Sequence, residues 1–307
     1  MLAIAQGMDL SIVILNYNTC EHLWACIRAL LAEGSTSLSG GPIQTEVLVV
    51  DNASSDRSAE MVAREFPWVA LTRSPRNGGF AYGNNQALMH ARGAKILLLN
   101  PDTRIPPGAI GRLIDRLDAH PEAGIVGPKL LRPNGTMHLA CRRSFPTPST
   151  AFYRFSGLAW LFPDSPRFGR YNLTFVDPDL PLEVDAVCGA CMLVRREVLE
   201  RIGLLDERFF MYGEDLDWCL RARVAGWTVR YEPSVVVQHQ HGAASRKRAL
   251  RTTFHFFRAM DLFYRKHYVN RYHPLVTGLV RTTIYAALGV ALFRRLLTSP
   301  SQRRVGF

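Results

Sequence analysis

Short aliphatic runs that end in polar residues recur along the first 245 positions of the chain. The clearest is Lys95–Asp102 (KILLLNPD), in which four aliphatic residues stop at Asn100, Pro101 and Asp102. A short apolar run bounded by a turn signal is typical of a strand buried on both faces. Asp102 is then predicted at the carboxyl end of a central strand, where open α/β sheets bind ligands and a carboxylate can hold a cation. An ordinary Pro-Asp turn is the alternative.

Two such runs precede it and are separated by a helical pattern. Leu10–Leu15 and Glu46–Val50 predict strands, and between them apolar residues recur at helical spacing over Glu21–Glu33. The right-handed crossover of a strand–helix–strand unit makes its two strands parallel. The polar residues that follow these two strands are Asn16, Asn18 and Asp51.

Asp51 has the position that holds a ribose in dinucleotide-binding folds. Those folds need a glycine-rich turn after the first strand, and NYNTCE at 16–21 contains no glycine. The sequence therefore argues against a nicotinamide or flavin site. Two interpretations of Asp51 remain: it holds a single nucleotide, or it makes an Asx turn or helix cap.

A glycine-rich segment follows a short predicted strand at Val69–Thr72. Its residues 76–85 read RNGGFAYGNN, and a helix is predicted from there to Arg92. Glycines allow close backbone approach, and open amide donors at a helix start suit an anion or a sugar. The candidate ligand-binding residues are Asn77, Gly78, Gly79 and Asn84. A turn without a ligand is the alternative.

The second half of this region continues with strands and helices around an irregular stretch. We predict strands at 124–131, 184–195 and 235–237. We also predict a helix at 107–120 and a second helix that follows the strand at 184–195 and ends at Ile202. Residues 141–181 are rich in Pro, Arg and aromatic side chains and carry no periodicity that assigns their structure. Insertions of this kind commonly carry specificity.

Two further groups of polar residues are candidates for chemistry. Glu214, Asp215 and Asp217 crowd the first turn of a predicted helix. The helix dipole favours carboxylates there, but three exceed what one cap needs, which favours acid–base chemistry. His239 and His241 follow the last predicted strand, and a histidine in that position is a candidate metal ligand.

The last sixty or so residues differ in composition. The chain of 307 residues carries a net charge of +11, and Arg246–Arg271 holds much of it. Such a segment suits anionic partners. Residues 275–293 are apolar around Arg281 and would form a helix about 28 Å long, but a central arginine makes a membrane span costly. We expect a basic, aromatic helical appendage on a membrane surface; a buried packing helix and a true span are the alternatives.

The cysteines and the N-terminus bear on the compartment. Six cysteines lack the spacing of a disulfide framework, which favours a reducing compartment. Cys188 and Cys191 form a C-x-x-C without a second ligand pair, and the residues after it read as a strand, so we interpret both as small buried residues. MLAIAQGMD lacks the basic start of a secretory signal, so we expect no export.

Taken in order, these segments make the chain resemble the inverting glycosyltransferase family 2, particularly its bacterial rhamnosyltransferase-like branch. The matching segments are SIVILNYN (11–18), VLVVDNASSD (47–56), RNGGFAYGNNQAL (76–88), ILLLNPDT (96–103), VCGACMLVRREVL (187–199), LLDERFFMYGEDLDWCLRARVAGW (204–227) and HQHGAAS (239–245). The resemblance implies an α/β GT-A fold over residues 1–245, with a Rossmann-like, mostly parallel sheet flanked by helices. Residues 246–307 would form the helical appendage.

The resemblance also implies roles for the candidate residues. Asp51 would contact the nucleoside, Asp102 would bind Mg²⁺ or Mn²⁺, and Asp215 would be the catalytic base with Glu214 beside it. His239 would be a further metal or diphosphate contact, with His241 as the alternative. One departure is Asn100, where the broader family has the first Asp of a D-x-D.

The implied reaction is transfer of one sugar, because the Q-x-x-R-W motif of processive synthases is absent from the sequence. By analogy with the branch, the donor is dTDP-L-rhamnose, with a UDP-hexose or UDP-galactofuranose as alternatives. The acceptor is a glycan, expected to be lipid-linked, at the inner face of the cytoplasmic membrane. A nucleic-acid-binding protein is a rival suggested by the basic tail, but phosphates would be repelled by the acidic clusters. An inactive transferase-like module is the second rival.

Overall fold

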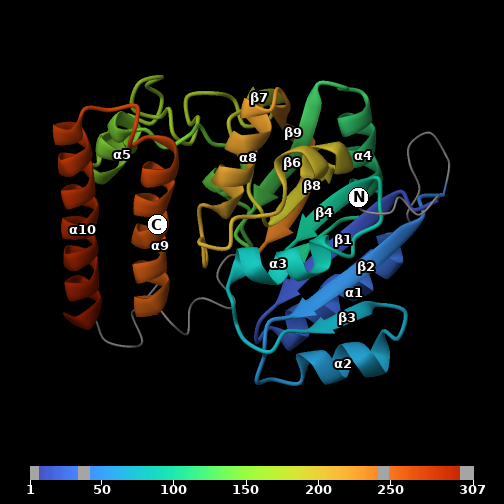
Figure 1. The fold of residues 1–307 in the computed structure, drawn as a ribbon. Helices are drawn as coiled ribbons and strands as arrows, with labels where there is room; N and C mark the ends of the chain where they lie inside the picture. Colours follow the sequence, from blue (N-terminus) through green and yellow to red (C-terminus); the bar gives the residue numbers. More distant parts are fainter. Residues whose placement is uncertain (1–6, 34–41, 241–248, 298–307) are drawn as a thin grey trace.

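The computed structural model describes residues 7–33, 42–240 and 249–297. Within these residues a mixed nine-stranded sheet has the order β3-β2-β1-β4-β8-β6-β9-β5, and β7 pairs with β9 (Figure 1). The strands are β1 (Leu10–Asn16), β2 (Thr45–Asp51), β3 (Ala70–Arg73), β4 (Lys95–Leu99), β5 (Thr103–Arg104), β6 (Ala123–Leu131), β7 (Leu182–Val184), β8 (Cys191–Arg195) and β9 (Thr228–His239).

Helices cover both faces of this sheet and extend to one side of it (Figure 1). They are α1 (Cys20–Glu33), α2 (Ser58–Glu65), α3 (Phe80–Leu88), α4 (Ala109–Asp118), a 3₁₀ turn (Leu139–Cys141), α5 (Pro148–Phe155), α6 (Leu158–Leu161), α7 (Arg196–Ile202), α8 (Glu214–Val224), α9 (Ala249–His267) and α10 (Pro274–Leu297). The predicted α/β fold with a C-terminal helical segment is confirmed.

The first four strands form one parallel block of the sheet, and β6 and β9 form a second parallel pair. β1 pairs with β2 and β4, and β2 pairs with β3, all parallel. The aliphatic residues of β1, β2 and β4 are almost all buried, as expected for strands covered on both faces. The register places Asn16 opposite Asp51, so the polar residues that end β1 and β2 meet at one edge.

Several elements differ in extent from their prediction. The predicted strand 184–195 is two strands, β7 and β8, because 185–190 leaves the sheet to contact the candidate site. β9 begins at Thr228 rather than Val235; its alternating burial, with Val229 and Tyr231 inside, is a half-buried strand pattern that the shorter prediction missed. α3 ends at Leu88 instead of Arg92.

The unassigned stretch 141–181 is ordered by polar contacts rather than by periodicity. Thr147 caps α5 with a reciprocal capping box with Thr150. The buried guanidinium of Arg142 donates to the backbone carbonyls of Asp177 (2.8 Å), Leu173 and Val176. One arginine therefore fixes a long irregular loop, which no hydrophobic pattern could reveal.

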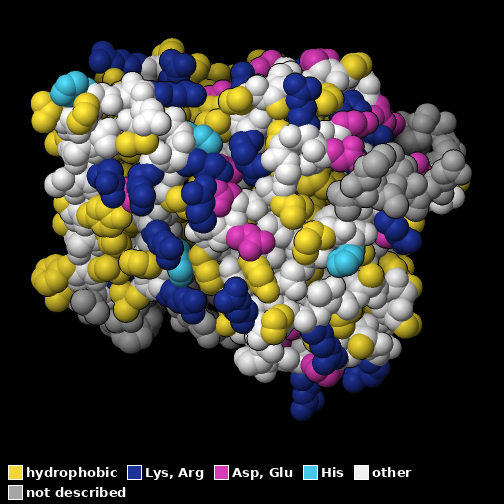
Figure 2. Space-filling view, in the orientation of Figure 1, with side chains coloured by type: hydrophobic (Ala, Val, Ile, Leu, Met, Phe, Trp, Pro, Cys, Tyr) yellow, Lys and Arg dark blue, Asp and Glu magenta, His cyan; other side chains and the backbone are white. Residues whose placement is uncertain are grey.

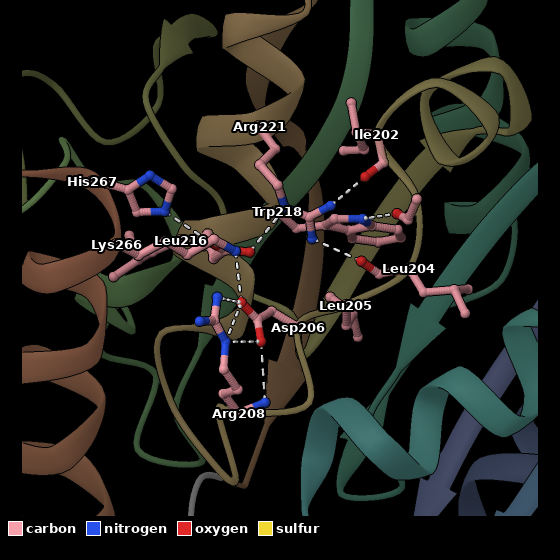
Figure 3. A network of polar contacts seen from close by, with 12 residues as sticks. Ile202, Leu204, Leu205, Asp206, Arg208, Leu216, Trp218, Arg221, Lys266 and His267 are labelled. Carbon is pink, nitrogen blue, oxygen red and sulfur yellow. Dashed lines mark hydrogen bonds and ion pairs between the residues drawn. The ribbon is translucent and has the colours of Figure 1, made fainter.

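The C-terminal helices pack against the rest of the protein and against each other. α9 and α10 stand side by side in Figure 1, and α9 places Phe263 and Tyr264 in the main hydrophobic core. Lys266 and His267 of α9 reach Asp217 of α8 at 2.6 and 2.7 Å. Arg221 approaches the same fully buried carboxylate at 2.9 Å. Figure 3 shows Arg221, Lys266 and His267 in this network. The helix that carries the acidic cluster is thereby tied to α9.

α10 is long and apolar enough over Pro274–Arg295 to cross a membrane by length and composition, and only 6% of its most apolar window is buried. Its central Arg281 pairs with Asp261 of α9 at 2.7 Å, and Tyr285 donates to the same carboxylate. The positive charge that makes a lone apolar helix costly to insert is thus compensated within the pair.

Candidate active site

A cavity of about 770 Å³ lies at the carboxyl ends of β1, β2 and β4 and extends to α9 and α10. Asp102, His239, Glu214 and Asp215 all line it. Side chains separated by more than a hundred positions in the sequence therefore share one cavity.

Asp102 and His239 form the first pair in this cavity. β5 turns back after Pro101 and pairs antiparallel with β9, with Thr103 opposite His239. The amide of Gln240 donates to the carbonyl of Asp102 at 2.9 Å. These contacts hold His239 Nε2 at 3.2 Å from Asp102 Oδ1, with both side chains almost fully buried.

This pair has a geometry that suits a divalent ion. Adjacent ligands of an octahedral ion at about 2.1 Å lie about 3 Å apart, close to the distance between these two atoms. A carboxylate oxygen suits Mg²⁺ and Mn²⁺, and imidazole is a common metal ligand. Asn100 Nδ2 lies 3.4 Å from His239 Nε2, so the residue that departs from D-x-D still borders the pair.

Asp215 lies at the start of α8 and is held from three sides. Arg143 Nη2 donates to Asp215 Oδ2 at 2.6 Å, and the Gly189 amide donates to the same oxygen at 3.2 Å. The Leu216 amide donates to Oδ1. Burial alone would lower the pKa of Arg143, but the charges of Asp215, Tyr171 and Cys188 and the hydrogen bond to Asp215 together raise that pKa above its ordinary value. Arg143 is therefore a permanent cation beside this carboxylate.

Glu214 has a different environment from its neighbour. Burial, and then the charge of Asp215, raise the pKa of Glu214 to about 8. Its Oε2 has no hydrogen-bond partner among the described residues. Glu214 is thus largely protonated at neutral pH, whereas Asp215 is paired with a cation. Two adjacent acidic residues in the sequence consequently have distinct electrostatic states.

The loop 188–190 joins the two halves of the site. The Gly189 amide contacts Asp215, while the Ala190 carbonyl accepts from the Asn100 amide at 2.9 Å. Cys188 in this loop is a free thiol, and burial first, then the charge of Asp215, raises the pKa of Cys188 to about 12. A neutral buried thiol agrees with the interpretation of Cys188 as a packing residue.

Only part of the candidate nucleotide-binding set lines the cavity, and Asn16, Asp51 and Gly78 are not among its lining residues. Asn77 and Gly79 line it directly, together with Asn52, which the sequence pattern did not single out. Asp51 is buried behind Asn52, and Asn16 Nδ2 donates to its Oδ1 at 3.0 Å. The amide of Ser54 donates to Asp51 Oδ2. Asp51 thus organises the turn after β2 from inside.

Asn18 and Asn84 also have local partners. Asn18 Oδ1 accepts from the amide of Ser55 at 2.7 Å, and Asn84 Nδ2 donates to the Phe80 carbonyl within α3. Neither residue is among those that line the cavity.

The glycine segment does not present the open donors that we expected. The amides of Gly78 and Gly79 donate to Asn52 Oδ1 and Asn77 Oδ1, and the Phe80 amide donates to the Phe210 carbonyl at 2.6 Å. A Cβ on Gly79 would lie 2.2 Å from that carbonyl oxygen, and its φ is +93°. The glycine is required for close approach of α3 to the loop before Glu214, which positions the acidic cluster.

Sequence reasoning missed four residues that line the cavity: Arg143, His138, Arg132 and Arg154. Three of them come from the irregular stretch or its border, where no period marks the inward positions. The Arg-rich composition of 141–181 was the available signal. His138 lies beside His239 with ring centroids 5.4 Å apart. His241, the alternative metal ligand, is outside the described residues.

The comparisons with known proteins agree with this architecture. One relative is the N-acetylglucosaminyl-diphospho-decaprenol L-rhamnosyltransferase of Mycobacterium tuberculosis. It is 28% identical to this chain over 241 residues, which cover 75% of each chain. A dTDP-rhamnosyl transferase of Shigella flexneri is 26% identical over 205 residues, covering 66% of this chain and 62% of that one.

The fold is shared with solved glycosyltransferases. A mannosyltransferase of Pyrobaculum calidifontis, solved with GDP-mannose and Mn²⁺, superposes with a TM-score of 0.56 at 17% identity, over 97% of this chain and 78% of that one. The family profile described as glycosyl transferase family 2 matches residues 11–203, well over half of the chain. With the fold and the strand-end cavity in agreement, the chain belongs to glycosyl transferase family 2.

Proposed function

We propose that this glycosyltransferase is metal-dependent and moves a single L-rhamnose from dTDP-rhamnose onto a hydroxyl of a lipid-linked glycan, with inversion. The observation that carries the proposal is that the Asp102–His239 pair and Asp215 line one cavity. Rhamnose as the sugar is supported by the names of the M. tuberculosis and S. flexneri relatives.

Asp102 and His239 would hold Mg²⁺ or Mn²⁺. The described residues contain no cluster of three His, Cys, Asp or Glu side chains that could hold a metal, so diphosphate oxygens and water would complete the coordination. Such an ion supplies positive charge that stabilises a departing diphosphate. The two side chains fix where that diphosphate lies, and Asn52, Asn77 and Gly79 would border the nucleoside.

Asp215 would accept the proton of the attacking hydroxyl. Arg143 and the Gly189 amide donate to its Oδ2 and so fix the direction of the carboxylate. Glu214 would stay protonated beside it, so that negative charge is not doubled at the acceptor side. A positioned general base typically contributes a factor of about 10²–10⁴ to the rate.

The C-terminal helices would bring the enzyme to the inner face of the cytoplasmic membrane, with residues 246–307 as the membrane-associated segment. Exposed arginines recur every seven residues on α9, at Arg251, Arg258 and Arg265, and so share one face of the helix. Figure 2 shows Lys and Arg side chains gathered over the α9 side of the molecule, beside hydrophobic side chains. Basic residues next to an apolar surface favour anionic headgroups.

This function is tested by measuring which sugar nucleotide the protein binds most tightly. Calorimetry with dTDP-rhamnose, UDP-glucose, UDP-galactose and GDP-mannose in Mn²⁺ is expected to show tightest binding of dTDP-rhamnose, and loss of that binding when EDTA removes the metal. Tighter binding of a UDP-sugar would reassign the donor. Binding of none of them would favour the inactive transferase-like module.

A further inference from the structure

We infer that the outer part of the cavity, between α5, α9 and α10, is a binding groove for the first isoprene units of a polyprenyl diphosphate-linked acceptor. The inference rests on the proposed function for the lipid-linked nature of the acceptor and adds the place where the lipid binds. The groove is defined here as the cavity lining contributed by these three helices.

The first observation is the spacing of the α10 residues that line the cavity. They lie at intervals of three and four, so they form one continuous stripe of the helix. They are Val276, Leu279, Val280, Thr283, Ile284 and Ala287. At 1.5 Å per residue the stripe is about 16 Å long. This length suits the beginning of a polyprenyl chain and leaves its remainder to exit toward a membrane.

The facing walls are also apolar, and Phe256 and Met260 of α9 pack against the hydrophobic cluster that contains Ile284 of α10. α9 contributes Phe256, Met260 and Phe263, and α5 contributes Phe152 and Phe155. The ring of Phe155 stacks on the ring of Phe257 of α9, with 6.1 Å between the ring centroids, and this contact fixes α5 against the helix pair. Phe152 is 62% exposed and Leu279 is 68% exposed although both line the cavity. Such an apolar surface inside a cavity favours an apolar occupant.

The groove is continuous with the candidate active site, which selects the kind of occupant. The same cavity holds Asp215 at its polar part and Ala287 in the groove. A molecule that fills both must carry a hydroxyl at one end and a hydrocarbon at the other. A flat contact with a bilayer would not require continuity with Asp215.

Cations also line this cavity. Arg154 of α5 and Arg251 of α9 line it, and their described contacts are to neutral groups, Asn172 and His255 among them. Arg251 also lies over the Phe210 ring at 5.0 Å. Arginines without a described carboxylate partner suit the diphosphate that joins the glycan to its lipid.

The test compares two adjacent positions of α10, of which one lines the groove and the other does not. Thr283 lines the groove and Thr282 does not, and both are exposed. Calorimetry of the full chain with farnesyl diphosphate is expected to show binding at least tenfold tighter than with inorganic diphosphate. Thr283→Trp fills the groove and is expected to remove that gain, whereas Thr282→Trp keeps it. Ala287→Trp repeats the test one turn further along, and thermal melts confirm that each variant folds.

Two outcomes would overturn the groove: farnesyl diphosphate binding no tighter than diphosphate, or equal effects of Thr283→Trp and Thr282→Trp. Equal weakening of binding to anionic vesicles by both variants would identify the helix face as a bilayer contact instead. These binding measurements need no donor. Farnesyl diphosphate binding as expected, without sugar transfer to any lipid-linked acceptor, would therefore reject the proposed function and leave the groove standing.

Discussion

At the scale of single residues, the site separates two adjacent carboxyl groups by their surroundings. Asp215 faces a buried guanidinium, whereas Glu214 is buried next to a negative charge. Desolvation disfavours an ionised group, and a nearby cation favours it. The same two positions that look equivalent in the sequence are thereby suited to different tasks, one to accept a proton and the other to remain neutral.

The raised pKa of Glu214 predicts how stability depends on pH. The unfolded chain releases this proton near pH 4.5 and the folded chain near pH 8. The stabilising contribution is therefore full below pH 4.5 and is lost as the pH rises toward 8, by up to about 1.4 kcal/mol per pH unit. Glu214→Gln mimics the neutral acid, so its stability relative to wild type is expected to increase between pH 5 and pH 8.

Urea denaturation at pH 5, 6.5 and 8 measures this difference. Glu200→Gln, on the exposed side of α7, is the matched control and should give no such trend. A pH dependence of Glu214→Gln that parallels wild type would show that Glu214 is already ionised in the folded protein.

The proposed metal pair makes a second prediction at this scale. Asp102→Asn removes the carboxylate ligand, and donor affinity in Mn²⁺ is expected to fall about tenfold or more, to the level of wild type in EDTA. Calorimetry with the donor measures both. Asp164→Asn, at an exposed position remote from the pair in sequence, should behave as wild type. If EDTA weakened donor binding to Asp102→Asn as strongly as it weakens donor binding to wild type, the ion would be bound elsewhere.

At the scale of helices and strands, the sequence predicted the strand ends better than the loops. Four aliphatic residues followed by Asn-Pro-Asp favoured a buried strand with a polar stop, and Asp102 lies directly after that strand. Arg143 could not be predicted, because its role depends on a loop that is ordered by Arg142 and backbone carbonyls rather than by a repeating pattern. The open donors predicted at Gly78 and Gly79 were wrong because Asn52 and Asn77 occupy them.

The junction of α8 and α9 makes a prediction at this scale. Burial alone would raise the pKa of Asp217, but His267, Lys266 and Arg221 lower it below its ordinary 3.8. The contribution of Asp217 to stability is therefore present above pH 3.8 and lost as the pH falls through the lowered value. Asp217→Asn leaves three cationic or basic groups without their shared partner and is expected to cost about 3–5 kcal/mol.

Urea denaturation at neutral pH tests this, with hydrogen exchange of α9 as a local readout. Asp118→Asn is the control: Asp118 is half-exposed and pairs with Lys95 and Arg195, so its loss should cost about 1 kcal/mol or less. Equal costs for the two variants would mean that the network in Figure 3 does not hold α9 to α8.

At the scale of the whole molecule, a family 2 catalytic fold and a pair of C-terminal helices share one cavity. The basic stripe of α9 and the exposed apolar surface of α10 lie together on this side of the protein. We expect this side to face the membrane, so that the acceptor enters from the bilayer and the nucleotide-sugar from solvent. α9 packs into the core of the catalytic fold and also lines the cavity, so the acceptor route and the nucleotide-sugar route can lead to the same site.

Vesicle binding checks this orientation. Each basic residue near an anionic surface contributes about 1 kcal/mol, so Arg258→Gln combined with Arg265→Gln is expected to weaken binding to anionic vesicles about 30-fold. Arg64→Gln with Arg73→Gln removes the same charge from α2 and β3 and should change little. No binding of wild type at physiological salt would remove the membrane from the account.

The most direct test of the central claim compares wild type with Asp215→Asn in the same two assays. Donor affinity is measured by calorimetry, and sugar transfer to a lipid-linked glycan acceptor by mass spectrometry of the product. The account predicts that Asp215→Asn binds the donor as tightly as wild type and loses about 10²–10⁴-fold in transfer rate. Transfer by this variant at the wild-type rate would contradict it.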